Sequence, residues 1–270
     1  MENRKFDDLI HLLKKLGSVV VAFSGGVDSS FLLYAAHKAL GDRAIAVLGT
    51  SPIHPKWEHQ QAIDLARQLG VRLIGVETTE MQNEAFTSNP PNRCYICKKA
   101  IMGTLRELAE KEGFAHVIEG SNVDDLGDFR PGMDALKELG IHSPLLEVGL
   151  TKKEIRTLSK EIGLPTWDRP SMACLASRIP YGREITTQKL ARVAVTELTL
   201  RDLGFDQLRV RDHGEIARIE LKPDDIARAA DERTRTAIIK AGESAGYTYV
   251  CLDLKGYRTG AMNEVLGSEI

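Results

Sequence analysis

The sequence predicts an α/β domain built on a parallel sheet, followed by a small α+β domain. In the first part, short apolar runs alternate with helical patterns of about ten to fifteen residues, which is typical of right-handed βαβ units. After residue 187 the expected order changes to helix, strand, strand, helix, strand. The stretch between the two parts is irregular and rich in Pro, Gly, Ser and Arg. We therefore expect domains at residues 1–167 and 188–270, joined by a connector at residues 168–187 that carries Cys174.

The elements of the first domain each follow from a local pattern. Residues 2–16 place apolar side chains at helical spacing, and residues 18–23 form the short apolar run expected of a buried parallel strand. Glycines close several of the helices, because the residue after a helix often adopts a left-handed conformation. The further expected elements are helices at 28–40, 55–69, 98–112, 133–139 and 152–162 and strands at 44–48, 72–76 and 116–119.

The second domain is expected to hold two helices and three strands. Cys251 lies in an alternating run at its end, so we expect this thiol to be a small buried apolar group. The expected elements are helices at 188–203 and 223–243 and strands at 207–212, 216–221 and 247–253.

Composition and charge exclude several classes of protein. Hydrophobic residues make up 43% of the chain and charged residues 27%, which rules out disordered, collagen-like and disulfide-scaffold proteins. The net charge is −2, and residues 188–270 carry 13 basic and 14 acidic side chains, so we expect neither nucleic acid nor a membrane surface as partner. The sequence shows no apolar run long enough to span a bilayer and no secretory signal, so we expect a cytoplasmic protein.

A glycine-rich loop follows the first strand of the predicted sheet. Gly25 and Gly26 allow the backbone to approach an anion closely, and the helix that follows offers unpaired N–H groups. The hydroxyls of Ser24, Ser29 and Ser30 add possible donors. The loop lacks the lysine of a Walker loop, and it is not a Gly-x-Gly-x-x-Gly motif. The plain alternative is an ordinary tight turn between a strand and a helix.

A second polar segment follows the strand expected at residues 116–119. In a parallel sheet, ligands bind beyond the carboxyl ends of the strands, so we expect Gly120 and Asn122 to join the nucleotide site. Asp125 is a candidate Mg²⁺ ligand there. The alternative is a solvated acidic loop that caps a helix.

The string Ser-Gly-Gly-Val-Asp-Ser at residues 24–29 resembles the PP-loop of the ATP pyrophosphatase family, whose members adenylate a substrate and release pyrophosphate. The resemblance implies an adenine nucleotide α-hydrolase-like sheet, a loop that binds the β- and γ-phosphates of ATP, and a role for Asp28 in placing Mg²⁺. Donors and a cation at this point would stabilise the departing polyanion. The loop alone leaves the substrate open, because asparagine and GMP synthetases, tRNA-modifying enzymes and sulfur transferases share it.

Further motifs narrow the choice of substrate. They are NRCYICKK at residues 92–99, SNVDDLGDFRPG at 121–132, PSMACLASRIPYG at 170–182 and GYRTGAMN at 256–263. Together with the loop they resemble the LarE family of ATP-dependent sacrificial sulfur transferases. The resemblance implies that pyridinium-3,5-biscarboxylic acid mononucleotide is adenylated and converted to thiocarboxylates for the nickel-pincer nucleotide cofactor. Cys174 matches the cysteine that attacks the acyl-adenylate and loses its sulfur, becoming dehydroalanine.

Cys94 and Cys97 accompany Cys174, which departs from the single-cysteine members of that family. In LarE-like proteins with all three, the resemblance implies a [4Fe-4S] cluster, whose three thiolate ligands leave one iron open for a transferable sulfide. The sacrificial route through Cys174 stays an alternative. A redox disulfide and a zinc site are also open, although the spacing supports no fourth zinc ligand.

Arginines are the candidate substrate ligands. Arg169 and Arg178 flank Cys174, where they would lower the pKa of the thiol or hold the substrate's phosphate or carboxylates. Arg209 and Arg211 alternate on a strand and so share one face, and with Arg258 they form a candidate phosphate-binding patch. The alternative is a set of exposed strand arginines paired with neighbouring carboxylates.

Three other functions are weaker interpretations of the sequence. A PP-loop tRNA thiolase would normally bring a basic RNA-binding module, and the even charge balance argues against one. An amide-forming synthetase gives no reason for the three cysteines and needs a source of ammonia. A regulatory nucleotide-binding module would bind ATP without releasing pyrophosphate. We also expect a homo-oligomer.

Overall fold

The structure is a computed structural model that describes residues 4–127, 132–170, 173–258 and 260–266. Residues 128–131, 171–172 and 259, which belong to three of the sequence motifs, lie outside the described residues. Contacts divide the chain into two compact units. Unit 1 comprises Met1–Asn83 and Asn92–Met172, and unit 2 comprises Glu84–Pro91 and Ala173–Ile270. The domain limits expected from the sequence stay a prediction.

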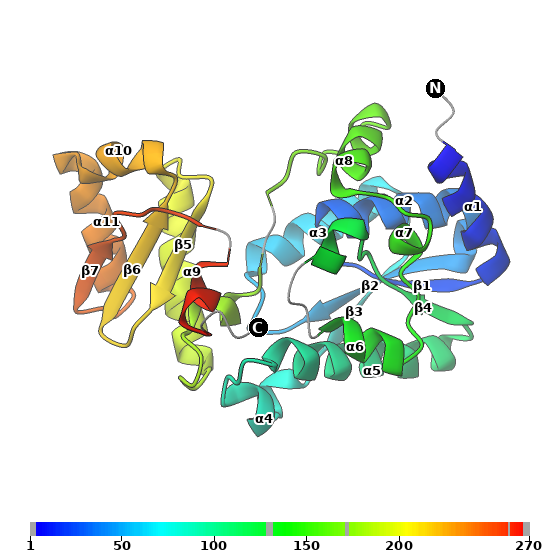
Figure 1. The fold of residues 1–270 in the computed structure, drawn as a ribbon, viewed down its shortest axis with the longest axis horizontal. Coiled ribbons are helices and arrows are strands. Elements are labelled where there is room, and N and C mark those ends of the chain that lie inside the picture. Colours follow the sequence, from blue (N-terminus) through cyan, green and yellow to red (C-terminus); the bar gives the residue numbers. More distant parts are fainter. Residues whose placement is uncertain (1–3, 128–131, 171–172, 259, 267–270) are drawn as a thin grey trace. The chain divides into compact units, whose positions relative to one another are not determined.

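Unit 1 is built on the parallel sheet that the sequence predicts (Figure 1). Its order is β3-β2-β1-β4, and all neighbouring strands run in the same direction. The bounds are β1 (Val19–Ala22), β2 (Ala44–Thr50), β3 (Leu73–Glu77) and β4 (His116–Ile118). Because β1 and β2 are central, helices cover both of their faces, and their side chains are almost entirely apolar.

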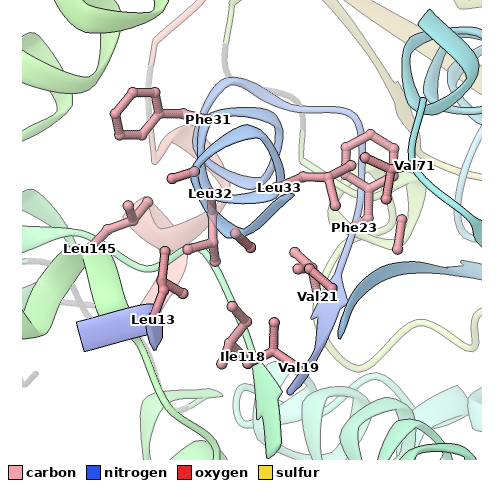
Figure 2. Packing of buried hydrophobic residues seen from close by; sticks show 14 of the residues in the cluster. Leu13, Val19, Val21, Phe23, Phe31, Leu32, Leu33, Val71, Ile118 and Leu145 are labelled. Carbon is pink, nitrogen blue, oxygen red and sulfur yellow. The ribbon is translucent and has the colours of Figure 1, made fainter. Parts of the chain in front are cut away.

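Helices pack on both faces of this sheet (Figure 1). On one face, Figure 2 shows Phe31, Leu32 and Leu33 of α2 among strand side chains such as Val21 and Ile118. On the other face, α5 and α6 cover the opposite side of the same strands. The bounds are α1 (Arg4–Leu16), α2 (Val27–Leu40), α3 (Lys56–Gln68), α5 (Arg93–Glu112), α6 (Gly132–Glu138), α7 (Pro144–Glu147) and α8 (Lys152–Glu161).

The start of α5 differs from the sequence prediction. The helix begins at Arg93 rather than at residue 98, so Cys94 and Cys97 lie in its first two turns. Pro90 and Pro91 precede it, and a proline before a helix start is compatible with a helix that begins soon after. The first two turns of α5 show no clear helical period of apolar residues, so the sequence pattern places the start of the helix too late.

Unit 2 is a small α+β fold, as predicted. Its sheet has the order β5-β6-β7, with β5 and β6 antiparallel and β6 and β7 parallel. The segment Glu84–Pro91 belongs to this unit because the Asn89 side-chain amide donates to three backbone carbonyls of residues 179–183. The bounds are α4 (Glu84–Thr87), α9 (Thr187–Asp202), β5 (Leu208–Asp212), β6 (Ile216–Leu221), α10 (Ile226–Ala230), α11 (Glu232–Ser244) and β7 (Tyr249–Leu252).

Two predictions for unit 2 are wrong. The single helix expected at 223–243 is broken between α10 and α11, because Asp231 adopts an extended conformation and caps α11 by accepting from the Thr234 N–H. Cys251 is exposed rather than buried. It lies on the edge strand β7, and the alternation there directs Tyr249 and Cys251 to solvent while Val250 and Leu252 are half-buried.

Within the residues that the structure describes, no helix is both long enough and apolar enough to cross a membrane.

Candidate active site

The phosphate loop, residues 24–30, follows β1 and includes the first residues of α2, and it is shaped by one close approach. Gly25 has a φ of +73°, which disfavours any residue with a side chain. A Cβ placed there would lie 2.9 Å from the Cβ of Ala62 on α3. The Ser24 and Ser29 hydroxyls lie 3.0 Å apart and hydrogen-bond to each other. The glycine therefore lets α3 and the loop meet.

The end of β4 packs against the first turn of α2. A Cβ on Gly120 would lie 3.0 Å from the Ser29 backbone nitrogen, so this glycine also permits a close backbone approach. Beyond it, the Asn122 N–H donates to Asp125 Oδ2 at 2.9 Å. Asp125 lies near enough to Asp28 that its charge helps to raise the pKa of that carboxyl. The structure thus brings Gly120, Asn122 and Asp125 to the same edge of the sheet as Asp28.

A pocket of about 150 Å³ opens beside the phosphate loop. Five predicted residues line it, namely Ser24, Gly25, Gly26, Asp28 and Arg169, whereas Ser29 and Ser30 are buried and are not part of the lining. Its charged lining residues are the acids Asp28 and Glu58 and the bases Lys152 and Arg169. The full lining consists of Ser24, Gly25, Gly26, Val27, Asp28, His54, Glu58, Lys152, Arg169 and Pro170.

Lys152 is a pocket residue that the sequence analysis missed. Its ammonium group donates to Asp28 Oδ2, although the two residues are 124 positions apart in the chain. The other oxygen, Asp28 Oδ1, is buried and has no hydrogen-bond partner among the described residues. Burial raises the pKa of Asp28, and the Lys152 charge partly opposes that shift. No local pattern marks Lys152, because it is one of two adjacent lysines at a helix start.

Arg169 supports the phosphate loop. Its guanidinium donates to the Gly25 carbonyl oxygen at 2.8 Å. Arg156 on α8 holds the segment in turn, donating to the carbonyl oxygens of Trp167 and Arg169 at 2.7 Å each. Burial lowers the pKa of Arg169, while the charges of Glu58 and Asp168 oppose the shift. The residue that the sequence placed beside Cys174 thus also contacts the nucleotide loop.

Cys94 and Cys97 lie near the start of α5, at the same edge of the unit 1 sheet as the phosphate loop. Residues three apart in a helix share a face, with Cβ atoms roughly 5–6 Å apart. Cys94 is exposed and Cys97 is half-buried. The next residue, Lys98, forms a 3.2 Å ion pair with Glu119, which directly follows β4. This pair ties the cysteine-bearing end of α5 to the carboxyl end of β4, which neighbours β1 in the sheet.

Glu119 is the buried member of that ion pair, and it is surrounded by donors. Ser143 donates to it at 2.6 Å and the Ser121 hydroxyl at 2.9 Å. Burial alone would raise the pKa of Glu119, but the Lys98 charge and these hydroxyl donors outweigh it and hold the pKa below its usual value. The carboxylate is therefore a fixed ionised anchor for α5.

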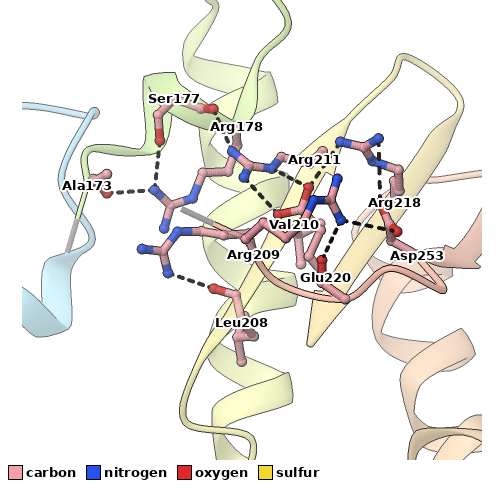
Figure 3. A network of polar contacts seen from close by, with 12 residues as sticks. Ala173, Ser177, Arg178, Leu208, Arg209, Val210, Arg211, Arg218, Glu220 and Asp253 are labelled. Carbon is pink, nitrogen blue, oxygen red and sulfur yellow. Dashed lines mark hydrogen bonds and ion pairs between the residues drawn. The ribbon is translucent and has the colours of Figure 1, made fainter. Parts of the chain in front are cut away.

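In unit 2, the segment that carries Cys174 is held by Arg178 (Figure 3). The Arg178 guanidinium forms two hydrogen bonds to the Glu197 carboxylate, at 2.8 and 3.0 Å, and both side chains are buried. Its remaining nitrogen donates to the carbonyl oxygens of Ala173 and Cys174, at 2.6 and 3.1 Å. Cys174 itself is half-buried. Arg178, held by two hydrogen bonds to Glu197, therefore fixes the backbone carbonyl groups of Ala173 and Cys174.

The other predicted arginines extend this network across the sheet (Figure 3). Arg211 is buried and pairs with Glu220 at 2.7 Å, and Arg218 shares the same carboxylate at 3.0 Å. Arg209 is also buried, and burial together with the Arg178 charge lowers its pKa. Arg258 joins at the edge, 3.9 Å from Asp253 and 3.0 Å from Glu264.

These contacts bear on both sequence interpretations of the strand arginines. The exposure expected under the alternative is wrong, because Arg209 and Arg211 are only 7% and 5% exposed. The expected pairing with a neighbouring carboxylate is present at Arg211, which pairs with Glu220, and the phosphate-binding patch stays a prediction. Three buried guanidinium groups, those of Arg178, Arg209 and Arg211, lie beside two buried carboxylates, Glu197 and Glu220. The partly exposed Arg218 pairs with Glu220 and also with Asp253, at 3.6 Å. The buried part of the network therefore carries an excess of positive charge.

The three cysteines predicted to bind a cluster belong to different units. Cys94 and Cys97 lie in unit 1 and Cys174 lies in unit 2. Over residues 4–127, 132–170, 173–258 and 260–266, no group of three or more His, Cys, Asp or Glu side chains is arranged to hold a metal ion. The [4Fe-4S] cluster stays a prediction.

Comparison with known proteins identifies the family. An uncharacterised protein of Synechocystis is 42% identical over 266 residues, which cover 98% of this chain and 99% of that protein. The pyridinium-3,5-bisthiocarboxylic acid mononucleotide synthase (LarE) of Lactiplantibacillus plantarum is 38% identical over 260 residues, which cover 96% of this chain and 93% of the synthase. The chain belongs to the LarE family. The LarE match spans both units, so it includes the phosphate loop and the arginine network.

Shorter matches connect this LarE-family chain to other ATP-using enzymes. The NAD synthase family model matches residues 7–112, which include the phosphate loop. A component of the glutamine-hydrolyzing GMP synthase of Methanocaldococcus jannaschii is 30% identical over 155 residues, 54% of this chain and 50% of that protein. The resemblance to the PP-loop superfamily and to the LarE family that the motifs indicate is thereby confirmed.

Proposed function

We propose that this LarE-family chain uses ATP to adenylate the carboxylates of pyridinium-3,5-biscarboxylic acid mononucleotide and converts them to thiocarboxylates for the nickel-pincer nucleotide cofactor. The observation that carries the proposal is the 38% identity, across both units, to a synthase named for the bisthiocarboxylic acid product. The pocket at the phosphate loop supports the ATP-dependent half of the reaction, and the arginine network supports binding of the mononucleotide phosphate.

ATP binding is assigned to the phosphate loop of unit 1. The start of α2 and the hydroxyl of Ser24, which lines the pocket, supply donors for the β- and γ-phosphates, while Gly120 and Asn122 shape the neighbouring loop. Mg²⁺ fits at Asp28, because Oδ1 is a buried oxygen without a hydrogen-bond partner among the described residues. Asp125 is the second candidate ligand. The cation supplies charge neutralisation on the departing pyrophosphate.

The mononucleotide phosphate is assigned to the arginine network of unit 2. The guanidinium groups of Arg209 and Arg211 lie in the part of the network where positive charge exceeds negative charge. A dianionic phosphate would supply the missing negative charge and accept bidentate hydrogen bonds. Arg258 borders this region through Asp253. Arg178 is engaged by Glu197 and by backbone carbonyls, so its role is to position the Cys174 segment and to add charge.

The sulfur step follows from the chemistry of a mixed anhydride. Adenylation joins a substrate carboxylate to AMP and releases pyrophosphate, and a thiolate then displaces AMP to form a thioester. On the sacrificial route the thiolate is that of Cys174. Loss of its α-proton then expels the thiocarboxylate and leaves dehydroalanine at position 174. The protein thereby loses the elements of H₂S, and the substrate exchanges one oxygen for sulfur.

The alternative sulfur source is a [4Fe-4S] cluster held by Cys94, Cys97 and Cys174. The two thiols of α5 suit such a cluster, because they share a helix face and one is exposed. When bound, the cluster would supply a sulfide for transfer, and Cys174 would keep its own sulfur. The three cysteines would then serve as cluster ligands, and the ATP site at the phosphate loop would activate the substrate carboxylate.

Mass spectrometry of both the nucleotide product and the protein tests the proposal. We expect the chain, ATP, Mg²⁺ and the biscarboxylic acid mononucleotide to give pyrophosphate and a product with oxygen replaced by sulfur. Cys174→Ala should keep pyrophosphate release and abolish thiocarboxylate. The matched control is Cys251→Ala, because that thiol is exposed on β7 and has no assigned role. Thiocarboxylate formation by Cys174→Ala would contradict the assignment.

The same measurement separates the two sulfur sources. Protein reconstituted anaerobically with iron and sulfide is compared with metal-free protein. On the cluster route we expect about four Fe per chain and no loss of protein mass, and Cys94→Ala or Cys97→Ala should abolish both iron binding and transfer. On the sacrificial route the protein loses the mass of H₂S once, and the two variants stay active.

A further inference from the structure

We propose that His54 takes up a proton when a nucleoside triphosphate binds and then contacts it as an imidazolium, with the buried carboxylate of Glu80 as its balancing charge. The inference rests on the proposed binding of ATP at the phosphate loop and adds a proton to that binding step. Neither residue belongs to any of the motifs found in the sequence.

Glu80 is a buried carboxylate without a hydrogen-bond donor. It begins the short 3₁₀ helix Glu80–Gln82 that follows β3, and it is 0% exposed. Neither of its carboxylate oxygens has a hydrogen-bond partner among the described residues. Buried polar atoms are nearly always paired, because an unpaired one loses its contact with water and gains nothing in exchange. Such a carboxylate favours the protonated form of a base that lies near it.

His54, in the loop between β2 and α3, is the base that feels this charge. Burial, helped by the charge of His59, lowers the pKa of His54 from 6.5 to about 4, and the charge of Glu80 opposes the shift. The rings of His54 and His59 lie 6.0 Å apart. The buried Nε2 of His59 has no hydrogen-bond partner among the described residues. His54 is therefore neutral near pH 7 as long as no other anion comes close.

His54 also lines the pocket at the phosphate loop, together with Gly25 and Gly26. A triphosphate held at the N-terminus of α2 would enter this pocket and bring its negative charges close to the imidazole ring. An opposite charge within about 4–6 Å raises the pKa of a base by roughly 1–3. The added anion and Glu80 together therefore make the imidazolium a substantial form of His54 near pH 6. Its N–H can then donate a charge-assisted hydrogen bond to a phosphate oxygen.

The other charged groups around His54 leave room for one more positive charge. Three carboxylates and two cations surround it, and His59 is the remaining titratable group. The carboxylates are Glu80, Glu58 of α3 and Asp28 of α2, and the cations are Lys152 of α8 and Arg169. The sum is therefore slightly negative before a nucleotide binds. A triphosphate makes it more negative even as its Mg²⁺ complex, so binding favours protonation of His54.

Calorimetric titration of the full chain with α,β-methylene-ATP tests the inference, because that analogue cannot release pyrophosphate. Titrations in Mg²⁺ at pH 6, in two buffers of different ionisation enthalpy, give the number of protons taken up for each bound analogue. We expect the unaltered protein to take up a fraction of a proton more than His54→Gln, which serves as the baseline because the analogue itself titrates in this range. Binding at pH 6 relative to pH 8 should be roughly 2- to 10-fold tighter in the unaltered protein than in His54→Gln.

Glu80→Gln tests the role of the carboxylate, because it keeps the shape of the side chain and removes its charge. We expect its proton uptake to fall toward that of His54→Gln, while its binding of the analogue at pH 8 stays unchanged. The control is His11→Gln, at an exposed position on α1, which should take up as many protons as the unaltered protein. Binding of the analogue at pH 8 shows that each variant is folded.

Two results would overturn the inference while leaving the proposed function in place. One is equal proton uptake by His54→Gln and the unaltered protein, which would mean that His54 stays neutral in the complex. The other is full proton uptake by Glu80→Gln, which would remove the carboxylate from the account. Absence of analogue binding by the unaltered protein would instead remove the proposed function together with this inference.

Discussion

The guanidinium group of Arg169 donates a 2.8 Å hydrogen bond to the carbonyl oxygen of Gly25. One end of the phosphate loop is therefore held by the chain segment that leads, five residues later, to Cys174. Arg156 braces the same segment through two carbonyl oxygens. The loop geometry thus depends on contacts from outside the loop, and substitutions at such contacts should have measurable effects.

Gly25→Ala should destabilise the protein more than the same change at another left-handed glycine. Gly25 and Gly70 have φ values of +73° and +69°, so an alanine at either costs about 1–2 kcal/mol of backbone strain. Only at Gly25 does the new Cβ meet another atom, the Ala62 Cβ at 2.9 Å, which adds about 1–3 kcal/mol of overpacking. Urea unfolding of both variants measures the difference. Equal losses would show that the contact with Ala62 is unimportant.

Glu119→Gln should lower stability at neutral pH by about 1–3 kcal/mol, because it removes a buried carboxylate from Lys98 and two serine hydroxyls. The pKa of Glu119 is lower in the folded state than its ordinary value of 4.5. Its contribution is therefore fully present above pH 4.5 and is lost as the pH falls through the folded-state pKa. The difference between the urea midpoints of the unaltered protein and of Glu119→Gln should therefore shrink below pH 4.5.

The control for that experiment is Glu138→Gln. Glu138 also pairs with a lysine on α5, Lys99 at 2.8 Å, but both side chains are 49% exposed. Water screens such a pair, so we expect a much smaller change in the urea midpoint. If the difference in urea midpoint between Glu119→Gln and the unaltered protein stays constant from pH 7 to pH 3, the claim that Glu119 stabilises the fold as a buried carboxylate is contradicted.

Arg178→Gln should destabilise unit 2 by about 3–5 kcal/mol, because it leaves Glu197 buried without its counter-ion. It also removes the donor to the carbonyl oxygens of Ala173 and Cys174. Hydrogen exchange of residues 173–178 should accelerate even where the rest of unit 2 stays protected. Arg178→Lys should recover only part of this, since an ammonium group cannot reproduce the bidentate geometry. Arg258→Gln, at the exposed edge of the network, should leave that exchange unchanged.

His54 should make the protein lose stability as the pH falls below neutrality. Burial, helped by the charge of His59 and opposed by that of Glu80, lowers the pKa of His54 from 6.5 to about 4. Between pH 6.5 and 4 the unfolded chain binds a proton that the folded protein does not, so the free energy of unfolding falls by up to about 3 kcal/mol. His54→Gln should flatten this part of the profile, whereas His11→Gln, at an exposed position on α1, should not. Parallel profiles for His54→Gln and the unaltered protein would refute the prediction.

Much of the site could be predicted because its signals are local. The strand at 18–23, the loop at 24–30 and the helix after it are neighbours in sequence, so their composition and spacing define the phosphate loop. Local spacing also places Arg209 and Arg211 on one face of a strand, while their role in binding phosphate stays a prediction. Their burial was not predictable, because it depends on what covers that face.

Periodicity and short motifs are properties of neighbouring residues, so the amino-acid sequence was enough to predict the parallel sheet, the phosphate loop and the family. Three features become visible only in the folded chain: Lys152 meets Asp28, Glu119 anchors Lys98, and Cys251 faces solvent. Each of these depends on residues brought together by packing or on which side of a strand is covered. A sequence pattern shows that a face is apolar or charged, but the packing of the chain selects its partner.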